Sequence, residues 1–243
     1  MNLDPDDFLI YDGDDPGLAD LIRQSPAHKL RFSARTEQAE AFIRDDKILF
    51  FNREFIATDE IVLKGQHNYK NIMAAGLACL QAGISDENIK DILRKFTGVE
   101  HRLEPVASIN GVHFINDSKA TTLESLAVAL KSFNTPILLI AGGKDKGVDY
   151  STVNSILQSN VRHVFLIGTA REKIAQAWEK VVPVSRYDSL EAAVKNAFDI
   201  AGQDENVLLS PACSSFDMFM DFEDRGKKFK EIVKKLNTIY ENQ

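Results

Sequence analysis

The side chains best suited to chemistry stand in one short run, Asn116 to Thr121. Within six residues it supplies an amide, a carboxylate, two hydroxyls and the ammonium of Lys119. The apolar residues 112–115 before it predict a short strand, and residues 123–131 after it have apolar side chains at helical spacing. A carboxylate ligand at this junction would meet unpaired backbone N–H groups and the positive end of a helix dipole. A helix cap would explain one of these side chains, but it leaves Lys119 unexplained unless that cation binds an anion.

Two further loops place polar groups directly after predicted strands. The loop Gly142–Gly147 has the spacing of neither a dinucleotide fingerprint nor a P-loop, so its Lys144 and Lys146 are either anion-binding groups or solvated turn residues. The loop 210–217 offers hydroxyls and backbone N–H groups that could bind a carboxylate. Covalent chemistry is disfavoured there, because the histidines show no triad pattern and Cys213 is expected to be a small packed residue.

Amide and basic side chains earlier in the chain could bind a nucleotide. Asn68 and Asn71 lie in the segment 65–71, three residues apart at the start of a predicted helix. They therefore share one helix face and could read the donor and acceptor edge of a purine. His101 and Arg102 could stack on a base or hold a phosphate. The alternatives are an exposed capping segment and a surface pair in a hinge, and the sequence leaves both open.

Composition excludes several classes of function. The chain has 243 residues, a formal net charge of -7 and 2 cysteines. The acidic balance argues against nucleic acid as a partner. The cysteines form neither a disulfide framework nor a metal-ligand pattern, which favours a reduced, cytoplasmic setting. The sequence shows no signal peptide and no apolar run long enough to span a membrane.

The candidate loops need a scaffold that brings them together, and residues 102–243 predict one. Strands and helices alternate here, with strands at 112–116, 136–141, 163–167, 181–185 and 206–210 and helices at 123–132, 151–158, 170–178, 189–200 and 222–238. Most of these strands are apolar throughout, which is typical of a parallel sheet covered on both faces. We therefore predict an α/β fold with a doubly wound, mostly parallel, Rossmann-like sheet. The loops after its strands should meet at one edge.

Residues before about Glu60 predict mainly β structure. Strands are expected at 8–11, 29–33, 41–43 and 48–51, and helices follow at 67–82 and 88–96. Asp45 and Asp46 form a plausible hairpin turn. Gly98 to Arg102 is expected to be the linker between the two parts of the chain.

These segments together resemble the Mur ligase family over nearly the whole chain. The G-Q-H-N-Y-x-N segment at 65–71 is similar to the family's adenine-contacting helix, and His101-Arg102 is similar to its H-R pair ahead of the C-terminal domain. The runs 116–121 and 208–215 are similar to those of the D-glutamate-adding members. The resemblance implies that residues 1–100 are the C-terminal part of the family's central ATP-binding domain, and that residues 101–243 are its C-terminal domain.

The resemblance implies an ATP-dependent amide ligase of peptidoglycan synthesis. ATP would phosphorylate the carboxylate of UDP-N-acetylmuramoyl-L-alanine, and the amine of D-glutamate would attack the acyl phosphate. The residues expected to contact ATP are Asn68, Asn71, His101, Arg102 and Asp117. Those expected around D-glutamate are Lys119, Thr121, Lys146, Ser215, Phe216 and Phe222. Lys119 and Arg102 would be the catalytic groups, since their charge can stabilise phosphate as it develops.

The chain departs from the family pattern at its beginning. The family's P-loop, its Mg²⁺ ligands and its uridine-nucleotide domain precede the segment that this chain matches. We therefore expect no metal ligands here, and we expect Met1 to begin a truncated piece that is inactive alone. An incomplete sheet would expose strand edges and favour self-association. Another ligase of the Mur or folylpolyglutamate type, or a non-catalytic nucleotide-binding module, remains the alternative.

Overall fold

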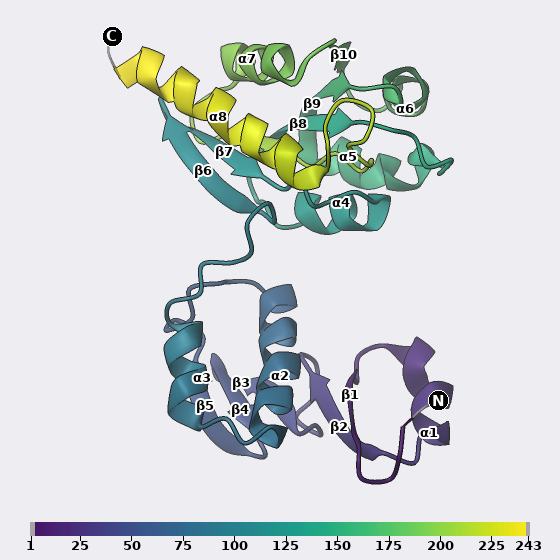
Figure 1. Cartoon of the computed structure of the whole chain (residues 1–243), viewed down its shortest axis with the longest axis vertical. Coiled ribbons are helices and arrows are strands. Elements are labelled where there is room, and N and C mark those ends of the chain that lie inside the picture. The colour runs from purple at the N-terminus through teal and green to yellow at the C-terminus, as the bar shows by residue number, and fades with distance from the viewer. Residues whose placement is uncertain (1–2, 242–243) are drawn as a thin grey trace. The chain divides into compact units, whose positions relative to one another are not determined.

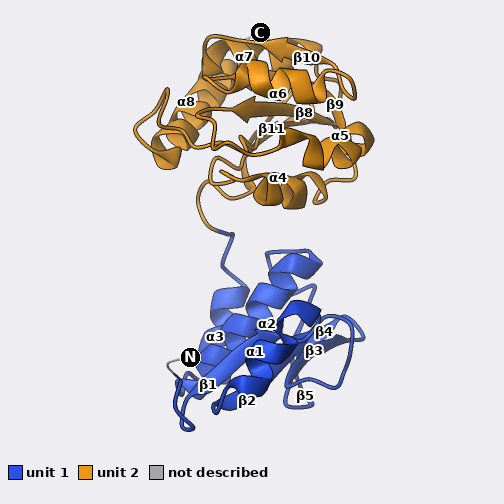
Figure 2. Ribbon diagram, turned by 90° about the vertical axis from the view of Figure 1, so that its right-hand side faces the viewer, with its two compact units in different colours: residues 1–98 blue, residues 99–243 orange. Residues whose placement is uncertain are grey.

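Two compact units make up the chain, Met1–Gly98 and Val99–Gln243 (Figure 1, Figure 2). The computed structural model describes residues 3–241, so Met1, where a truncation was expected, lies outside the described residues. Within the described part, no helix has both the length and the apolar character needed to cross a bilayer. Each unit is described by itself below.

The N-terminal unit is built on a five-stranded sheet in the order β1-β2-β3-β4-β5. Its strands are β1 (Phe8–Asp12), β2 (His28–Ser33), β3 (Ala41–Arg44), β4 (Lys47–Phe50) and β5 (Arg53–Ala57). The first three strands are parallel to one another, and β3, β4 and β5 are antiparallel. Asp45 and Asp46 turn the chain between β3 and β4 with φ of 47° and 55°, the left-handed backbone that a two-residue hairpin requires. Strand β5 was not predicted, and the expected self-association through the sheet edges stays a prediction.

Two helices cover this sheet, α2 (Gln66–Gln81) and α3 (Asp86–Leu93), and a third, α1 (Ala19–Gln24), follows β1 after the 3-10 turn η1 (Pro16–Leu18). Neither α1 nor η1 was predicted. Helix α2 packs closely, because a Cβ at Gly76 would lie 2.3 Å from the ring of Phe50. Met73 and Leu77 complete the buried contact with the sheet.

A partly buried group of ion pairs connects the start of α2 to the end of β1. The ammonium of Lys70 lies 2.9 Å from Asp12 Oδ2 and 2.8 Å from Asp14 Oδ2. The Asp14 side chain is only 4% exposed, and it also accepts hydrogen bonds from the Ser33 hydroxyl and the Ala34 N–H. Burial raises the pKa of Asp14, but the hydrogen bonds from Lys70, Ser33 and Ala34 outweigh it and lower that pKa to about 2. The segment that carries Asn68 and Asn71 is thereby held to the sheet.

The C-terminal unit contains the predicted α/β sheet, in the order β10-β9-β8-β11-β7-β6. Its strands are β6 (Glu104–Ile109), β7 (Val112–Asn116), β8 (Ile137–Gly142), β9 (Val161–Ile167), β10 (Val184–Arg186) and β11 (Asn206–Leu209). Strands β7 to β11 are parallel, as expected, and β6 adds an unpredicted antiparallel edge. The mixed α/β fold class predicted from the sequence is confirmed.

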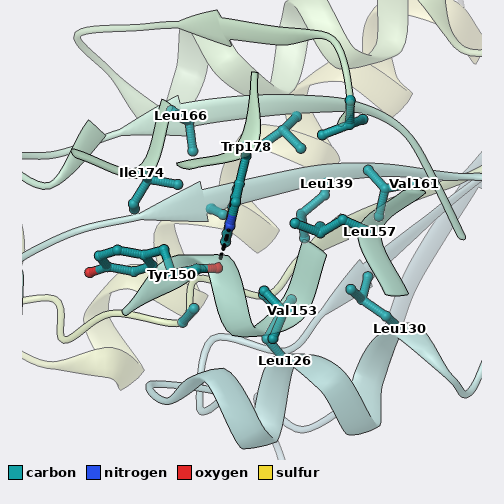
Figure 3. Packing of buried hydrophobic residues seen from close by; sticks show 14 of the residues in the cluster. Leu126, Leu130, Leu139, Tyr150, Val153, Leu157, Val161, Leu166, Ile174 and Trp178 are labelled. Atoms are coloured by element: carbon teal, nitrogen blue, oxygen red, sulfur yellow. Dashed lines mark hydrogen bonds between the residues drawn. The ribbon is translucent and has the colours of Figure 1, made fainter. Parts of the chain in front are cut away.

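Helices cover both faces of this sheet. The helical elements are α4 (Leu123–Leu130), η2 (Tyr150–Val153), α5 (Asn154–Asn160), α6 (Arg171–Trp178), α7 (Leu190–Ile200) and α8 (Phe222–Glu241). Side chains of α4, η2, α5 and α6 share one buried cluster with Leu139 and Leu166 (Figure 3). Side chains of α7 and α8 share the other cluster with Leu138 and Ile140. Because successive residues of β8 point into opposite layers, the whole strand is apolar.

Candidate ligand site at the carboxyl ends of the C-terminal strands

Three strand-end loops meet where β7, β11 and β8 lie side by side. The Ala212 N–H donates to Ala120 O at 2.9 Å, and the Lys144 N–H donates to Ser214 O at 2.9 Å. The loop after β11 therefore bonds to both neighbouring loops. The helix after β11 covers one face of the sheet, whereas those after β7 and β8 cover the other. Such a change of side opens the crevice in which doubly wound sheets bind ligands.

Asp117 directly follows β7 and is buried, with 4% of its surface exposed. One carboxylate oxygen accepts from the Ser210 hydroxyl at 2.8 Å, and the other accepts from the Leu103 N–H at 3.1 Å. Burial raises the pKa of Asp117 to about 6 against these two hydrogen bonds and the nearby charge of Arg102. The group predicted to face ATP is therefore a buried carboxyl that can hold a proton near neutral pH.

The cap of α4 is Thr122, whose hydroxyl accepts from the Ser125 N–H at 3.3 Å. Lys119 and Thr121 are consequently not needed for capping. The Lys119 ammonium is exposed and lies 5.4 Å from the ring centroid of Phe222. The Lys146 ammonium donates to Thr121 O at 2.7 Å. The Lys146 ammonium therefore contacts the loop that carries Lys119, although it comes from the loop after β8.

The third loop contributes Ser215 and Phe216, which differ sharply in exposure. Ser215 is buried, and its carbonyl oxygen accepts from the N–H groups of Met218 and Phe219. Phe216 is 67% exposed and is free to contact a ligand. Both residues follow Cys213, whose thiol is buried in the core as expected. Burial raises the pKa of that thiol, which disfavours it as a nucleophile.

Arg225, in the first turns of α8, is a residue that sequence reasoning missed. It is fully buried, and its guanidinium donates to Ser118 Oγ at 3.0 Å, to Ser118 O at 2.9 Å and to Cys213 O at 3.2 Å. Burial lowers its pKa to about 10, so it keeps its charge. It thus joins the loop after β7 to the loop after β11. Its position in a lysine-rich helix gave no sign of this role.

His101 is buried, whereas Arg102 beside it is exposed. The Asn116 amide nitrogen lies 2.9 Å from both His101 Nδ1 and Glu104 Oε2. Because an amide nitrogen can only donate, Nδ1 accepts. The ring proton therefore belongs on Nε2, a buried atom with no hydrogen-bond partner among the described residues. The Lys119 N–H donates to His101 O at 3.0 Å. The predicted linker therefore needs correction, since His101 is fixed to the C-terminal unit.

The remaining predicted residues, Asn68 and Asn71, belong to the N-terminal unit and are placed only within it. Both lie in the first turns of α2, as predicted. The Asn68 amide donates to Lys64 O at 2.8 Å, and Asn71 is exposed.

One cluster of possible metal ligands occurs among the described residues, formed by Glu100, His101 and Glu104 within 4.8 Å. The Lys230 ammonium already lies 2.6 Å from Glu100 and 2.8 Å from Glu104. Mg²⁺ prefers an octahedral set of oxygen ligands. A cluster that contains an imidazole and a bound lysine does not fit that ion, so no step is assigned to magnesium here.

Comparison with known proteins shows which proteins this chain is similar to. Residues 101–213 match the family model described as "Mur ligase, glutamate ligase domain". A protein of Alkaliphilus oremlandii named UDP-N-acetylmuramoylalanine--D-glutamate ligase is 41% identical over 242 residues, which cover 97% of this chain and 53% of that protein. Its namesake in Natranaerobius thermophilus is 43% identical over 235 residues, covering 93% and 51%. The chain spans about half the length of the curated relatives it matches.

Solved structures share the fold at low sequence identity. A murein peptide ligase from Psychrobacter arcticus superposes with a TM-score of 0.65 at 15% identity, covering 99% of this chain and 52% of that one. MurF from Acinetobacter baumannii has a TM-score of 0.66 at 16% identity, covering 92% of this chain and 52% of that chain. The folylpolyglutamate synthase/dihydrofolate synthase of Yersinia pestis gives 0.64 at 15%, covering 92% and 51%. At such identities the likeness concerns the fold alone.

Proposed function

Because residues 101–213 belong to the Mur ligase, glutamate ligase domain family, we propose that the protein takes part in the ATP-dependent ligation of D-glutamate to UDP-N-acetylmuramoyl-L-alanine. The relatives that match nearly all of this chain carry the name of that activity. The reaction converts a carboxylate into an acyl phosphate, which the amine of D-glutamate attacks. Domain roles follow from this proposal, with residues 1–100 as the end of an ATP-binding domain and residues 101–243 as the glutamate-binding domain.

The observation that carries the proposal is the contact of Lys146 with Thr121, two residues from Lys119 in the chain. Lys146 reaches Thr121 O from the loop after β8, and Lys119 lies two residues before Thr121 in the loop after β7. D-Glutamate has two carboxylates, and charge-assisted hydrogen bonds to cations from separate loops would fix both ends. Ser215 and the exposed Phe216 would line the same pocket from the loop after β11, with the ring of Phe222 beside Lys119.

Phosphate chemistry would use the positive charges of Arg102 and Lys119. Arg102 is exposed next to the buried Asp117, and its charge lowers the pKa of that carboxyl. A guanidinium in that position can stabilise negative charge as an acyl phosphate forms and breaks down, and Lys119 can do so from the neighbouring loop. Within the N-terminal unit, Asn68 and Asn71 would contact the adenine.

Calorimetry with D-glutamate and L-glutamate tests the proposal directly on this chain. We expect binding of the D isomer and weaker binding of the L isomer. The Lys146→Ala variant should weaken D-glutamate binding by roughly 10-fold or more, since a charge-assisted hydrogen bond contributes about 1.5–3 kcal/mol. Lys195→Ala, on the exposed face of α7, is the matched control. Equal affinity for both isomers, or no effect of Lys146→Ala, would refute the proposed site.

A further inference from the structure

Asp145 organises the loop that carries Lys146. One carboxylate oxygen accepts from the Gly147 N–H at 3.0 Å and from the Tyr150 hydroxyl at 3.0 Å. The other oxygen accepts from the Lys173 ammonium at 2.8 Å. The hydrogen bond from Lys173 lowers the pKa of Asp145, so this group is a carboxylate that can only accept. The residue next to Lys146 is therefore held from two directions.

Tyr150 is a rigid partner for this carboxylate. It is 2% exposed, and its carbonyl oxygen accepts from the Trp178 indole N–H at 2.8 Å. The two rings meet edge to face, with centroids 6.1 Å apart (Figure 3). The backbone and the ring of Tyr150 are both fixed by the core, so its hydroxyl has a defined position.

The same hydroxyl also contacts the loop after β11. Tyr150 Oη lies 3.2 Å from Cys213 Sγ, and both atoms are buried. Burial raises the pKa of the tyrosine and of the thiol, so both keep their protons. Because Asp145 can only accept, Tyr150 donates to Asp145 and the Cys213 S–H donates to Tyr150. A single hydroxyl therefore links the loop after β8 to the loop after β11.

We propose that Tyr150 is a positioning residue for the glutamate site: its hydroxyl, bonded to Asp145 and Cys213, sets the loop that carries Lys146 against the loop that carries Ser215. This inference rests on the proposed function for its ligand. A phenylalanine would fill the same space in the core, so packing alone gives no reason for the hydroxyl. The hydrogen bonds give one, because a preorganised pair of loops binds a small dicarboxylate without first having to order.

Tyr150→Phe removes the bridging hydroxyl and keeps the ring. The first measurement needs no ligand and follows hydrogen exchange of the Lys144 amide, whose N–H bonds to Ser214 O across the two loops. We expect exchange to become about 10-fold faster as the loops separate more often. Tyr240→Phe, which also removes one hydroxyl from this unit, should leave it unchanged. An unchanged rate in Tyr150→Phe would overturn the proposal.

The second measurement is the affinity for D-glutamate in the same variants. We expect Tyr150→Phe to weaken binding about 10-fold and Tyr240→Phe to have no effect. A merely structural role is separated by repeating the change in a Lys146→Gln background. If Tyr150 acts by positioning Lys146, Tyr150→Phe should weaken D-glutamate binding by less than about twofold in the Lys146→Gln background, because the ammonium that it positions is already absent. An undiminished loss, or full affinity in Tyr150→Phe, would overturn the proposal.

Failure of the proposed function would look different. Wild-type protein that shows no response to D-glutamate would refute the glutamate site itself. The exchange rate of the Lys144 amide would still decide whether the hydroxyl of Tyr150 holds the two loops together.

Discussion

Replacing Asp117 with Asn should make the C-terminal unit more stable at neutral pH. Asp117 accepts one hydrogen bond from the Leu103 N–H and one from the Ser210 hydroxyl. An asparagine can keep both, because its carbonyl oxygen can accept from Leu103 and its amide can donate to the oxygen of Ser210. The substitution therefore removes a buried charge and keeps a hydrogen bond to each of the two partners.

The magnitude follows from the pKa of Asp117. Burial raises it to about 6 from its ordinary 3.8, so the folded protein holds this proton more tightly than the unfolded chain does. Stability should therefore fall as pH rises from about 4 to about 6, and above that range the full loss of about 3 kcal/mol is present. Asparagine has no such titration. We expect Asp117→Asn to be more stable than wild type by about 3 kcal/mol near pH 8, and equal to it below about pH 3, where the carboxyl is protonated in both the folded and the unfolded state.

Urea unfolding at several pH values would measure this difference. Trp178 is the only tryptophan of the chain and is fully buried in the C-terminal unit, so its fluorescence reports that unit alone. Asp204→Asn, at an exposed turn, is the control for loss of a carboxylate. Parallel stability curves for wild type and Asp117→Asn between pH 4 and 8 would refute the reasoning. A gain of stability at a proposed ligand site is the trade-off expected where function requires a buried charge.

Three further substitutions test other parts of the structure. Arg225→Met should destabilise the C-terminal unit by about 3 kcal/mol, because it leaves two carbonyl groups and a hydroxyl without their charged donor. Unfolding followed by tryptophan fluorescence measures the loss of stability. A loss below about 1 kcal/mol would contradict the prediction. Gly168→Ala should lower the melting temperature more than Gly147→Ala does. Both glycines have φ near 77°, but only at Gly168 would a Cβ meet other atoms, at 2.5 Å and 2.6 Å. Equal decreases of the melting temperature would contradict the close approach at Gly168. Lys70→Met should destabilise the N-terminal unit by about 2 kcal/mol near pH 7. Because the pKa of Asp14 is held at about 2, this loss of stability should vanish as that carboxyl is protonated toward pH 2. Amide hydrogen exchange of α2 measures both the loss and its pH dependence.

The parallel sheet could be predicted because burial on both faces leaves a strong record in the sequence. Ile137 to Ile140 are all fully buried, which only a central strand covered on both sides requires. Edge strands leave a weaker record. Strand β6 contains Pro105 and has a single buried residue, Ile109, so its sequence lacks an apolar run. Its best signal was the turn that follows, where Asn110 and Gly111 adopt φ of 50° and 79°, as a two-residue hairpin requires.

Only part of the candidate site could likewise be predicted from the sequence. The convergence of the strand-end loops follows from the topology of a doubly wound sheet, and so it could be anticipated from the order of strands and helices. The burial of Arg225 and His101 could not be anticipated, because it depends on contacts between distant segments. Gly226 illustrates this, since a Cβ there would lie 2.3 Å from His101 Nδ1. Local sequence showed a basic helix and a polar linker, and tertiary packing placed both residues inside.

The anchoring of the residues around His101 has a mechanical consequence. Leu103 donates to Asp117, His101 accepts from Lys119, and the carboxylate of Glu100 pairs with Lys230, all within the C-terminal unit. Residues 100–103 are thereby fixed to the C-terminal unit, shortly after Gly98, whose φ is 112°. That backbone conformation suits glycine, so a side chain at Gly98 would restrict the backbone angles available at the border of the two units.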